Sequence, residues 1–189
     1  MNEQAQAVFD FWFQPGPGQP SGAPRREWFQ KDDAFDREIG RRFGALIDQA
    51  LAGGLLEWDA EGPQSQLARI LLLDQFTRNV HRGTPQAFAG DALALQAAQA
   101  MVDTGQDGAL PPLQRGFVYL PFEHAEDMAM QERQLALFQA TERPADDRWA
   151  EHHHAIIARF GRFPHRNRAL GRETTPEEQQ FLDEDGFAG

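Results

Sequence analysis

Residues 63–79 read PQSQLARILLLDQFTRN, and this stretch decides the class of fold. Pro63 suits the first position of a helix, where the N–H that proline lacks would have no partner. The run LARILLLDQF within it is apolar on almost every face, which is typical of a helix surrounded by other elements. The sequence therefore predicts a central helix here, with the remaining elements packed around it.

Apolar residues at helical spacing recur on both sides of this stretch, and the alternation typical of strands is almost absent. Upstream, we expect amphipathic helices over 4–13 and 33–52, the second ended by the glycine pair at 53–54. Downstream, Thr84 reads as the cap of an alanine-rich helix over 85–102, with proline at its first position.

Four more helices are expected in the C-terminal half, over 112–119, 121–138, 146–161 and 176–182. Asp146 or Asp147 is expected to cap the third of them. The fourth is opened by Thr175-Pro176-Glu177-Glu178, which has the pattern of a capping box. These elements predict an all-α fold of seven to eight helices in a single domain, residues 1–189, with a Pro/Gly-rich surface loop at 15–24.

The composition excludes several kinds of chemistry. The chain has no cysteine, which removes disulfides, thiolate metal ligands and cysteine nucleophiles. Neither of its serines, Ser21 and Ser65, lies in a G-x-S-x-G turn. Lys31 is the one lysine and no G-x-x-x-x-G-K motif surrounds it, so a P-loop is absent. Because a glycine-rich dinucleotide fingerprint is also missing, we expect no cofactor.

The chain also carries no signal for a membrane. Its apolar runs are all shorter than the roughly 18 residues of a membrane span. The N-terminal sequence MNEQAQAVFDFWF lacks the basic start of a signal peptide. We therefore expect a cytoplasmic protein of bacterial type with no membrane partner.

A basic block stands out in an otherwise acidic chain. Residues 159–172 read RFGRFPHRNRALGR, with five arginines, one histidine and no acid. The whole chain has a net charge of −11, and the part outside this block has a net charge of −16. Arg159 and Arg162 lie one helical turn apart and repel each other unless a negative group lies between them. That group belongs either to the protein or to a ligand.

A helix break divides this block, because Gly161 and Pro164 end the helix that precedes them. Three polar residues are then predicted to lie on a turn: His165, Arg166 and Asn167. Phe160 and Phe163 are expected to anchor this turn in the core. Arginines interleaved with aromatic residues occur in proteins that bind single-stranded RNA, but an acidic chain neutralises few phosphates, so we expect no nucleic acid.

Two further constellations carry charge. Asp74 and Arg78 are four residues apart and share a helix face, either as a buried ion pair or at the edge of a cleft. In the segment EHAED, His124 and Asp127 would meet if the segment opens a helix, giving a histidine tuned by a carboxylate. The structural alternative is that the carboxylates of EHAED complement the helix dipole.

Residues 152–154 are three consecutive histidines, which point about 100° apart around a helix and cannot share one metal shell. Glu151 and His154 form a single E-x-x-H pair, whereas a di-iron bundle needs two. We therefore predict no metal site.

Several long motifs resemble one family. They are LDQFTRN followed by RGTPQAF, then YLPFEHAEDMAMQERQLALF, then IIARFGRFPHRNRALGRETTPEEQQFL, together with VFDFWF and WFQKDDAFD near the N-terminus. On these motifs nearly the whole chain resembles the bacterial domain-of-unknown-function family 924. The resemblance implies an α-α superhelical, tetratricopeptide-like fold and no established activity. Thr77 stands where the family motif DQFPRN has proline, which leaves the end of this helix less sharply broken.

The resemblance also marks a set of signature polar residues. By position they are Asp74, Gln75, Arg78, Asn79, Arg82, His124, Glu126, Asp127, His153, Arg159, Arg162, His165, Arg166 and Asn167. Of the three consecutive histidines, only His153 occupies a position where the family pattern has histidine.

Three functions remain open. The first is a binding module that takes a small anionic ligand or a peptide carboxylate in a groove lined by arginine and histidine, since guanidinium groups suit that ligand. Its ligand-binding residues would be Arg78, Asn79, Arg82, His124, His153, Arg159, Arg162, His165, Arg166 and Asn167. The oligomeric state is open.

The second is a hydrolase-like enzyme that uses a histidine–carboxylate pair as general acid and base, with arginines stabilising negative charge. Its candidate catalytic residues are His124, Asp127 and His165. The third is a purely structural ionic network that latches the C-terminal segment to the core. Four acids lie on the signature segments, namely Asp74, Glu123, Glu126 and Asp127, against five arginines. That count slightly favours a bound anion.

Overall fold

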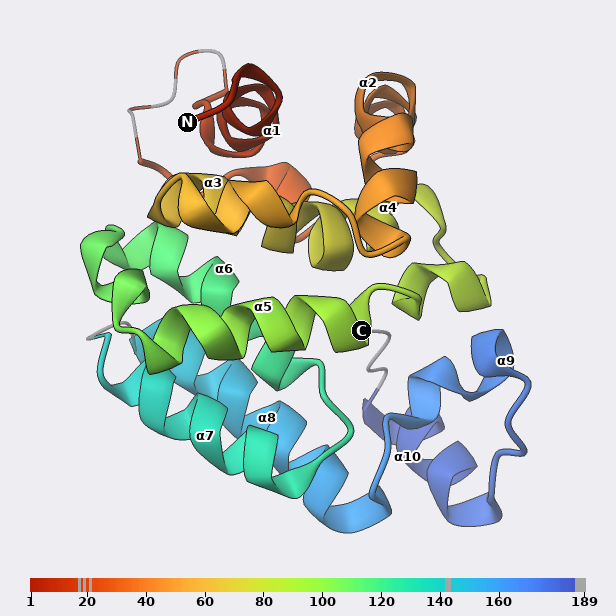
Figure 1. The fold of residues 1–189 in the computed structure, drawn as a ribbon. Coiled ribbons are helices and arrows are strands. Elements are labelled where there is room, and N and C mark those ends of the chain that lie inside the picture. The colour runs from red at the N-terminus through yellow and green to blue at the C-terminus, as the bar shows by residue number, and fades with distance from the viewer. Residues whose placement is uncertain (17, 19, 21, 142–143, 186–189) are drawn as a thin grey trace. The chain divides into compact units, whose positions relative to one another are not determined.

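The computed structural model describes residues 1–16, 18, 20, 22–141 and 144–185. Within them every regular element is helical (Figure 1), which confirms the all-α class. Eight of the described α-helices have nine residues or more, in agreement with the predicted number. None of them is long and apolar enough to cross a membrane. Positions 17, 19 and 21 of the predicted surface loop lie outside the described residues.

The chain divides into two compact units. The first comprises residues 1–82 and 86–121, and the second comprises residues 83–85 and 122–189. The single domain over residues 1–189 and the tetratricopeptide-like superhelix stay predictions.

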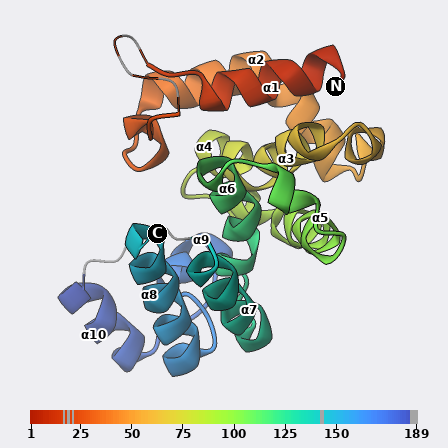
Figure 2. The ribbon, with the colours of Figure 1, turned by 90° about the vertical axis from the view of Figure 1, so that its left-hand side faces the viewer.

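Six helices contribute to the first unit. They are α1 (Glu3–Phe13), α2 (Asp33–Leu51), α3 (Pro63–Leu71), α4 (Thr77–Val80), α5 (Asp91–Asp103) and α6 (Pro112–Glu123) up to Pro121. Short 3-10 turns also occur, at η1 (Arg26–Trp28), η2 (Leu56–Ala60), η4 (Pro85–Phe88) and η5 (Gln106–Ala109). Figures 1 and 2 show α1 against α3.

The predicted central helix is present and runs without a break from Pro63 to Val80. Its middle, η3 (Leu72–Phe76), is a π-helical turn, in which one extra residue is inserted between successive hydrogen bonds. The Thr77 hydroxyl donates to the Leu72 carbonyl at 2.8 Å, and the Thr77 N–H is directed to the same oxygen. A proline at position 77 would supply neither donor, so threonine allows the helix to continue.

Aromatic rings from three helices meet on this turn. The fully buried Phe76 lies 6.0 Å from Phe11 and 5.4 Å from Trp12 of α1, measured between ring centroids. Phe43 of α2 lies 5.3 Å from the same ring. Aromatic burial of this size is a large share of the stability of a small unit, so the central helix organises the core of the first unit.

The predicted start of the alanine-rich helix is wrong. Thr84 and Pro85 do not open the alanine-rich helix, because Pro85 begins the 3-10 turn η4 and α5 starts only at Asp91. The reason lies at Gly90, where a Cβ would overlap the carbonyl oxygen of Leu73 in the π-helical turn. Only glycine lets the chain approach that carbonyl so closely, and the helix begins after this contact.

The second unit is built from α7 (Met128–Gln139), α8 (Pro144–Phe160), η6 (Pro164–Arg166), α9 (Asn167–Leu170) and α10 (Pro176–Asp185). Both views show α7 and α8 side by side (Figures 1 and 2). A buried apolar cluster joins α8, the turn after it and α10 through Ile156, Ile157, Phe163 and Phe181. Phe160 packs against this cluster, as predicted for the anchor of the turn.

Two predicted boundaries differ here. The helix α8 begins at Pro144, earlier than expected, and the side chains of Asp146 and Asp147 lie outside the described residues. Pro121 does not start a helix but lies inside the last turns of α6, and α7 begins at Met128. The reason is Asp127, whose carboxylate accepts the Met130 N–H at 3.1 Å and caps α7. The segment EHAED therefore spans the end of α6 and the cap of α7 rather than opening a helix.

The contact of Gly90 with Leu73 yields a stability test. We expect Gly90→Ala to lower the free energy of unfolding by about 3 kcal/mol, because the overlap involves backbone that cannot move aside. Gly44→Ala in α2 is the matched control: a Cβ there meets nothing within 4 Å, and alanine should stabilise the helix by roughly 0.5–1 kcal/mol. Urea unfolding measures both, and a Gly90→Ala protein as stable as the wild type would contradict the packing described.

Candidate functional site

The basic block of residues 159–172 lies wholly in the second unit. Gly161 ends α8 with φ at 68°, and its N–H donates to the Ile157 carbonyl at 2.8 Å. The turn that follows carries Phe163, which is fully buried. The predicted helix break and turn are thus both present, and they bring the arginines of the block close to carboxylates from two other segments.

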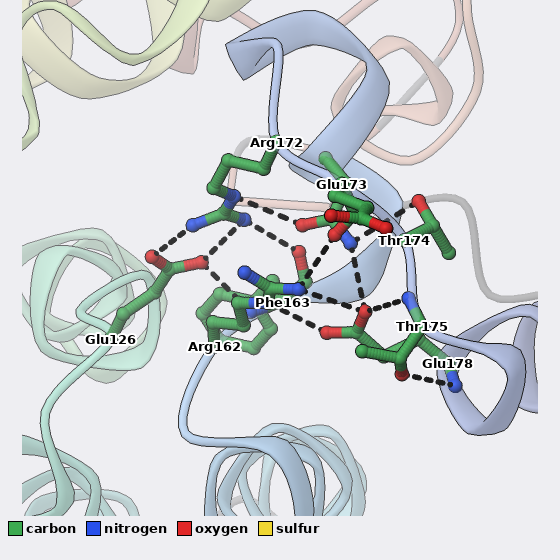
Figure 3. A network of polar contacts seen from close by, with 9 residues as sticks. Glu126, Arg162, Phe163, Arg172, Glu173, Thr174, Thr175 and Glu178 are labelled. Atoms are coloured by element: carbon green, nitrogen blue, oxygen red, sulfur yellow. Dashed lines mark hydrogen bonds and ion pairs between the residues drawn. The ribbon is translucent and has the colours of Figure 1, made fainter.

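The first of these carboxylates is Glu178 of α10. Arg162 donates Nε and an Nη group to its two oxygens at 2.6 and 2.9 Å (Figure 3), a bidentate pair. The predicted capping box is also confirmed, since Glu178 accepts the Thr175 N–H at 2.8 Å and donates its own N–H to the Thr175 hydroxyl at 3.2 Å. The hydrogen bonds from Arg162 lower the pKa of Glu178 to about 2. One carboxylate therefore both caps α10 and ties it to α8.

The second carboxylate is Glu126, in the connection before α7. Arg172 donates two bonds to it at 2.7 and 3.0 Å, and the Phe163 N–H donates a third at 2.7 Å (Figure 3). Burial alone would raise the pKa of Glu126, but the bonds from Arg172 and Phe163 together lower it. Arg172 also donates to the Phe163 carbonyl at 2.9 Å, so the turn is held at both its N–H and its C=O.

Asn167 joins the two ion pairs. It is fully buried, its Oδ1 accepts from Nε of Arg172 at 2.9 Å, and its Nδ2 donates to Glu178 at 3.2 Å. We call the five residues Glu126, Arg162, Asn167, Arg172 and Glu178 the latch. Arg159 adds an exposed ion pair with Glu177 at 3.0 Å.

A second group of polar residues surrounds Phe163. In α8, Nδ1 of His153 lies 2.8 Å from the Trp149 carbonyl oxygen and 3.2 Å from a carboxylate oxygen of Glu123. Both neighbours are acceptors, so we assign the proton to Nδ1, which leaves Nε2 as an acceptor. Burial lowers the pKa of His153 to about 3, so the ring is neutral at pH 7.

The remaining members come from the turn itself. The guanidinium of Arg166 lies 4.6 Å from the centre of the Phe163 ring, and Arg166 is only 5% exposed. The rings of His165 and His153 lie 5.6 and 5.5 Å from the same ring. We call Glu123, His153, His165 and Arg166 the Phe163 cluster. It combines one permanent cation, one carboxylate and two imidazoles.

Three of the predicted ligand-binding residues lie instead in the first unit. Arg78 donates to Asp74 at 2.8 Å, and its other Nη atom lies 2.9 Å from Asp91. This confirms the pairing of Asp74 and Arg78 as a contact inside the protein.

Asn79 and Arg82 are both directed at Asp36, with hydrogen bonds of 2.6 Å from each. Sequence reasoning missed Asp36 and Asp91 as partners. The spacing of residues along the sequence does not reveal such partners, because Asp36 is more than forty residues from Asn79 and Arg82, which it binds.

The predicted pairing of His124 with Asp127 stays a prediction. The carboxylate of Asp127 caps α7, and a further histidine–carboxylate contact joins His153 to Glu123. In the described part of the chain, no group of three or more histidine, aspartate or glutamate side chains is placed to hold a metal ion.

Sequence reasoning missed Glu177 and Glu178 as partners of the basic block, although it identified both as part of the capping box of the last helix. Counting them changes the charge balance of the second unit. Three carboxylates, Glu126, Glu177 and Glu178, pair with three of the five arginines of the block, namely Arg172, Arg159 and Arg162. Much of the charge of the block is therefore balanced within its own unit.

The latch predicts a specific loss of stability. We expect Glu178→Gln, which keeps a residue suited to the capping box, to lower the free energy of unfolding by about 2 kcal/mol, because Arg162 loses a desolvated partner. Glu177→Gln is the matched control: its ion pair is exposed and should be worth less than about 0.5 kcal/mol. Urea unfolding at pH 7 compares them, and equal losses would count against the latch.

The same variant predicts a dependence on pH. The pKa of Glu178 falls from 4.5 to about 2 on folding, so its charge stabilises the fold above pH 4.5 and ceases to do so as the pH falls toward 2. We expect the difference in unfolding free energy between wild type and Glu178→Gln to be constant above about pH 5 and to shrink below it. Other titrating groups are common to both proteins and cancel. A difference unchanged at pH 3 would contradict the assignment.

Comparison with known proteins places this arrangement in a family. Residues 8–186 match the model of a family described as bacterial protein of unknown function (DUF924). The chain is also similar to the solved structure of a protein of unknown function from Agrobacterium tumefaciens, with 45% identity over 95% of this chain and 97% of that one, and a TM-score of 0.85. No curated protein gives a significant match. The chain therefore belongs to the DUF924 family, as its motifs predicted.

Proposed function

We propose that this protein is a binding module whose second unit takes a small oxyanion, or the carboxylate of a peptide, at the Phe163 cluster. The observation that carries the proposal is Arg166, a permanent cation that is 5% exposed and stacked on Phe163. The backbone N–H of Arg166 donates to the Phe163 carbonyl oxygen at 3.1 Å, and Arg172 donates to the same oxygen. A guanidinium fixed in this way is preorganised for the bidentate bonds that oxyanions accept.

The latch and Arg159 assign three other arginines of the block to contacts within the protein. Arg159, Arg162 and Arg172 each direct their N–H groups to a carboxylate of the protein. Both ends of the Asn167 amide are likewise bonded within the latch. These residues are therefore proposed to position the turn, while Arg166 and its neighbour His165 contact the ligand.

The first unit is given no part in binding. Its three predicted ligand residues, Arg78, Asn79 and Arg82, direct N–H groups to the carboxylates of Asp74 and Asp36. An external anion would have to displace those carboxylates and approach their negative charge, which costs more than binding at a guanidinium stacked on an aromatic ring.

A second candidate, a hydrolase-like enzyme, is favoured by one contact. Glu123 lies 3.2 Å from Nδ1 of His153 and orients the ring. A histidine–carboxylate pair of this kind is typical of general acid–base chemistry, in which an arginine such as Arg166 stabilises developing negative charge. Hydrolysis of phosphoesters or amides by the wild type, lost in His153→Gln but kept in His154→Gln, would select this candidate. Absence of turnover in the wild type would remove it.

The binding proposal predicts a stabilisation by phosphate. At a phosphate concentration about tenfold above Kd, linkage adds about 1.4 kcal/mol and raises Tm by roughly 3 °C over chloride at the same ionic strength. Arg166→Gln should abolish this difference, and Arg166→Lys should reduce it because lysine lacks the planar fork.

Arg168→Gln is the control, since Arg168 is the exposed arginine two residues further on, in α9. It should keep the full difference, and any general effect of phosphate on protein hydration will be the same in both variants. Equal stabilisation of the wild type by phosphate and by chloride would refute the site.

A further inference from the structure

We infer that the surface covered by α10 is a docking surface for a partner, and that the partner it fits is an acidic amphipathic helix of another protein. In this chain α10 itself occupies the surface and shows which chemistry is recognised there. The inference does not depend on the proposed anion site, because it concerns the contacts that α10 makes.

The surface combines an apolar patch with a fixed positive charge. The patch is the buried cluster formed by Ile156, Ile157 and Phe163, at the end of α8 and in the turn after it. Beside it, Arg162 donates from Nε and Nη2 to the carboxylate of Glu178 at 2.6 and 2.9 Å. Such a surface suits a helix that presents a carboxylate and apolar side chains on one face.

Few side chains attach α10 to this surface. Among residues 176–184, Glu178 and Phe181 are the buried side chains, and Leu182 packs against the same apolar cluster. The rings of Phe181 and Phe160 lie 5.2 Å apart between centroids. Residues three and four positions after Glu178 lie on its face of the helix. The recognised pattern is therefore a glutamate followed after three and four residues by an aromatic and an aliphatic side chain.

Charge makes the surface selective for acidic helices. Arg159 and Arg162 pair with Glu177 and Glu178 at 3.0 and 2.6 Å. The carboxylate of Glu178 is 3% exposed, so this second pair is largely desolvated. A helix with a neutral residue in its place would leave Arg162 without that partner, which weakens docking far more than loss of an exposed pair does.

The start signal of α10 lies within the segment itself. Glu178 accepts the Thr175 N–H, and the Thr175 hydroxyl accepts the Glu178 N–H, so the capping box travels with the helix (Figure 3). Its buried polar attachment to the rest of the unit is the same carboxylate, which Arg162 and Asn167 bond. A second helix with the same pattern can therefore take the place of α10.

The position of α10 in the chain allows this exchange. It is the last helix that the structure describes, so its release interrupts no connection between α7, α8 and the turn. Release exposes few buried side chains, and it therefore costs less than unfolding of the whole unit. A partner helix competes with α10 against the effective concentration that the tether provides, which is on the order of millimolar.

The test uses a synthetic peptide of residues 174–185, TTPEEQQFLDED, with fluorescein at its N-terminus. Fluorescence anisotropy measures its binding to the full-length wild type and to the full-length Phe181→Ser protein, whose own α10 is weakly held. We expect the peptide to bind the Phe181→Ser protein at least about tenfold more tightly, because the competing helix is released more often. The Gln180→Ala protein, altered at an exposed residue of α10, is the control and should bind the peptide as the wild type does.

Variant peptides test the recognised pattern against the Phe181→Ser protein. Peptides that carry Glu178→Gln or Phe181→Ser should bind at least about tenfold more weakly than the unchanged peptide, as expected for buried anchors of an interface. A peptide that carries Gln180→Ala should bind as tightly as the unchanged one.

Hydrogen exchange of the wild type gives a measurement that needs no substitution. The amides in the last two turns of α10 are expected to exchange at least about tenfold faster than those in the middle of α8, since α10 opens separately. Equal exchange in both helices would show that α10 leaves only when the unit unfolds, and would overturn the inference even if Phe181→Ser failed to fold.

Three binding results would also overturn it. The first is absence of peptide binding to a Phe181→Ser protein that keeps the helical circular dichroism of the wild type. The second is binding that is indifferent to Glu178→Gln and Phe181→Ser in the peptide. The third is a wild-type dimer that the peptide dissociates, which would make the occupant the α10 of a second copy. None of these results bears on the response to phosphate that tests the anion site.

Discussion

The second unit depends on one electrostatic constraint: several guanidinium groups lie within a short turn and must be neutralised where they lie. Arg162 and Arg172 meet this constraint through bidentate bonds to Glu178 and Glu126, which come from segments on either side of the turn in the sequence. Because the buried Asn167 bonds to both pairs, a change in one is felt by the other. The helix α10 has few apolar residues of its own, and it is held by this network together with the packing of Phe181 and Leu182.

The same constraint distinguishes the arginines that form ion pairs within the protein from Arg166, which is proposed to contact a ligand. Arginines whose N–H groups meet carboxylates contribute rigidity. The ion pair of Glu126 and Arg172 holds the backbone of Phe163, since Glu126 accepts its N–H and Arg172 donates to its C=O. Arg166 lies on that fixed backbone with its guanidinium on the Phe163 ring. A binding group placed on a rigid support loses little entropy when a ligand arrives, so the latch is compatible with the proposed site.

Local patterns predicted what is determined locally. The central helix, the break at Gly161 and the capping box of α10 all follow from residue types within a few positions of one another. The start of α5 was wrongly predicted, since it is set by the contact of Gly90 with Leu73, a residue of another helix. The partners of the arginines escaped prediction for the same reason. Glu178 was visible as a cap, but its second role depends on where α8 places Arg162.

The contact between Glu123 and His153 shows how much of the candidate site the sequence could predict. A histidine beside a carboxylate was expected at His124 and Asp127; the structure places His153 beside Glu123, and Asp127 caps α7. A carboxylate that is buried beside an imidazole lowers the stability of the fold unless it forms hydrogen bonds or an ion pair. Retaining Glu123 in such a place is a cost that packing alone does not require, since an apolar residue would fill the same volume. The contact of Glu123 with Nδ1 of His153 offsets part of that cost, and it orients the imidazole that lies beside the ring of Phe163.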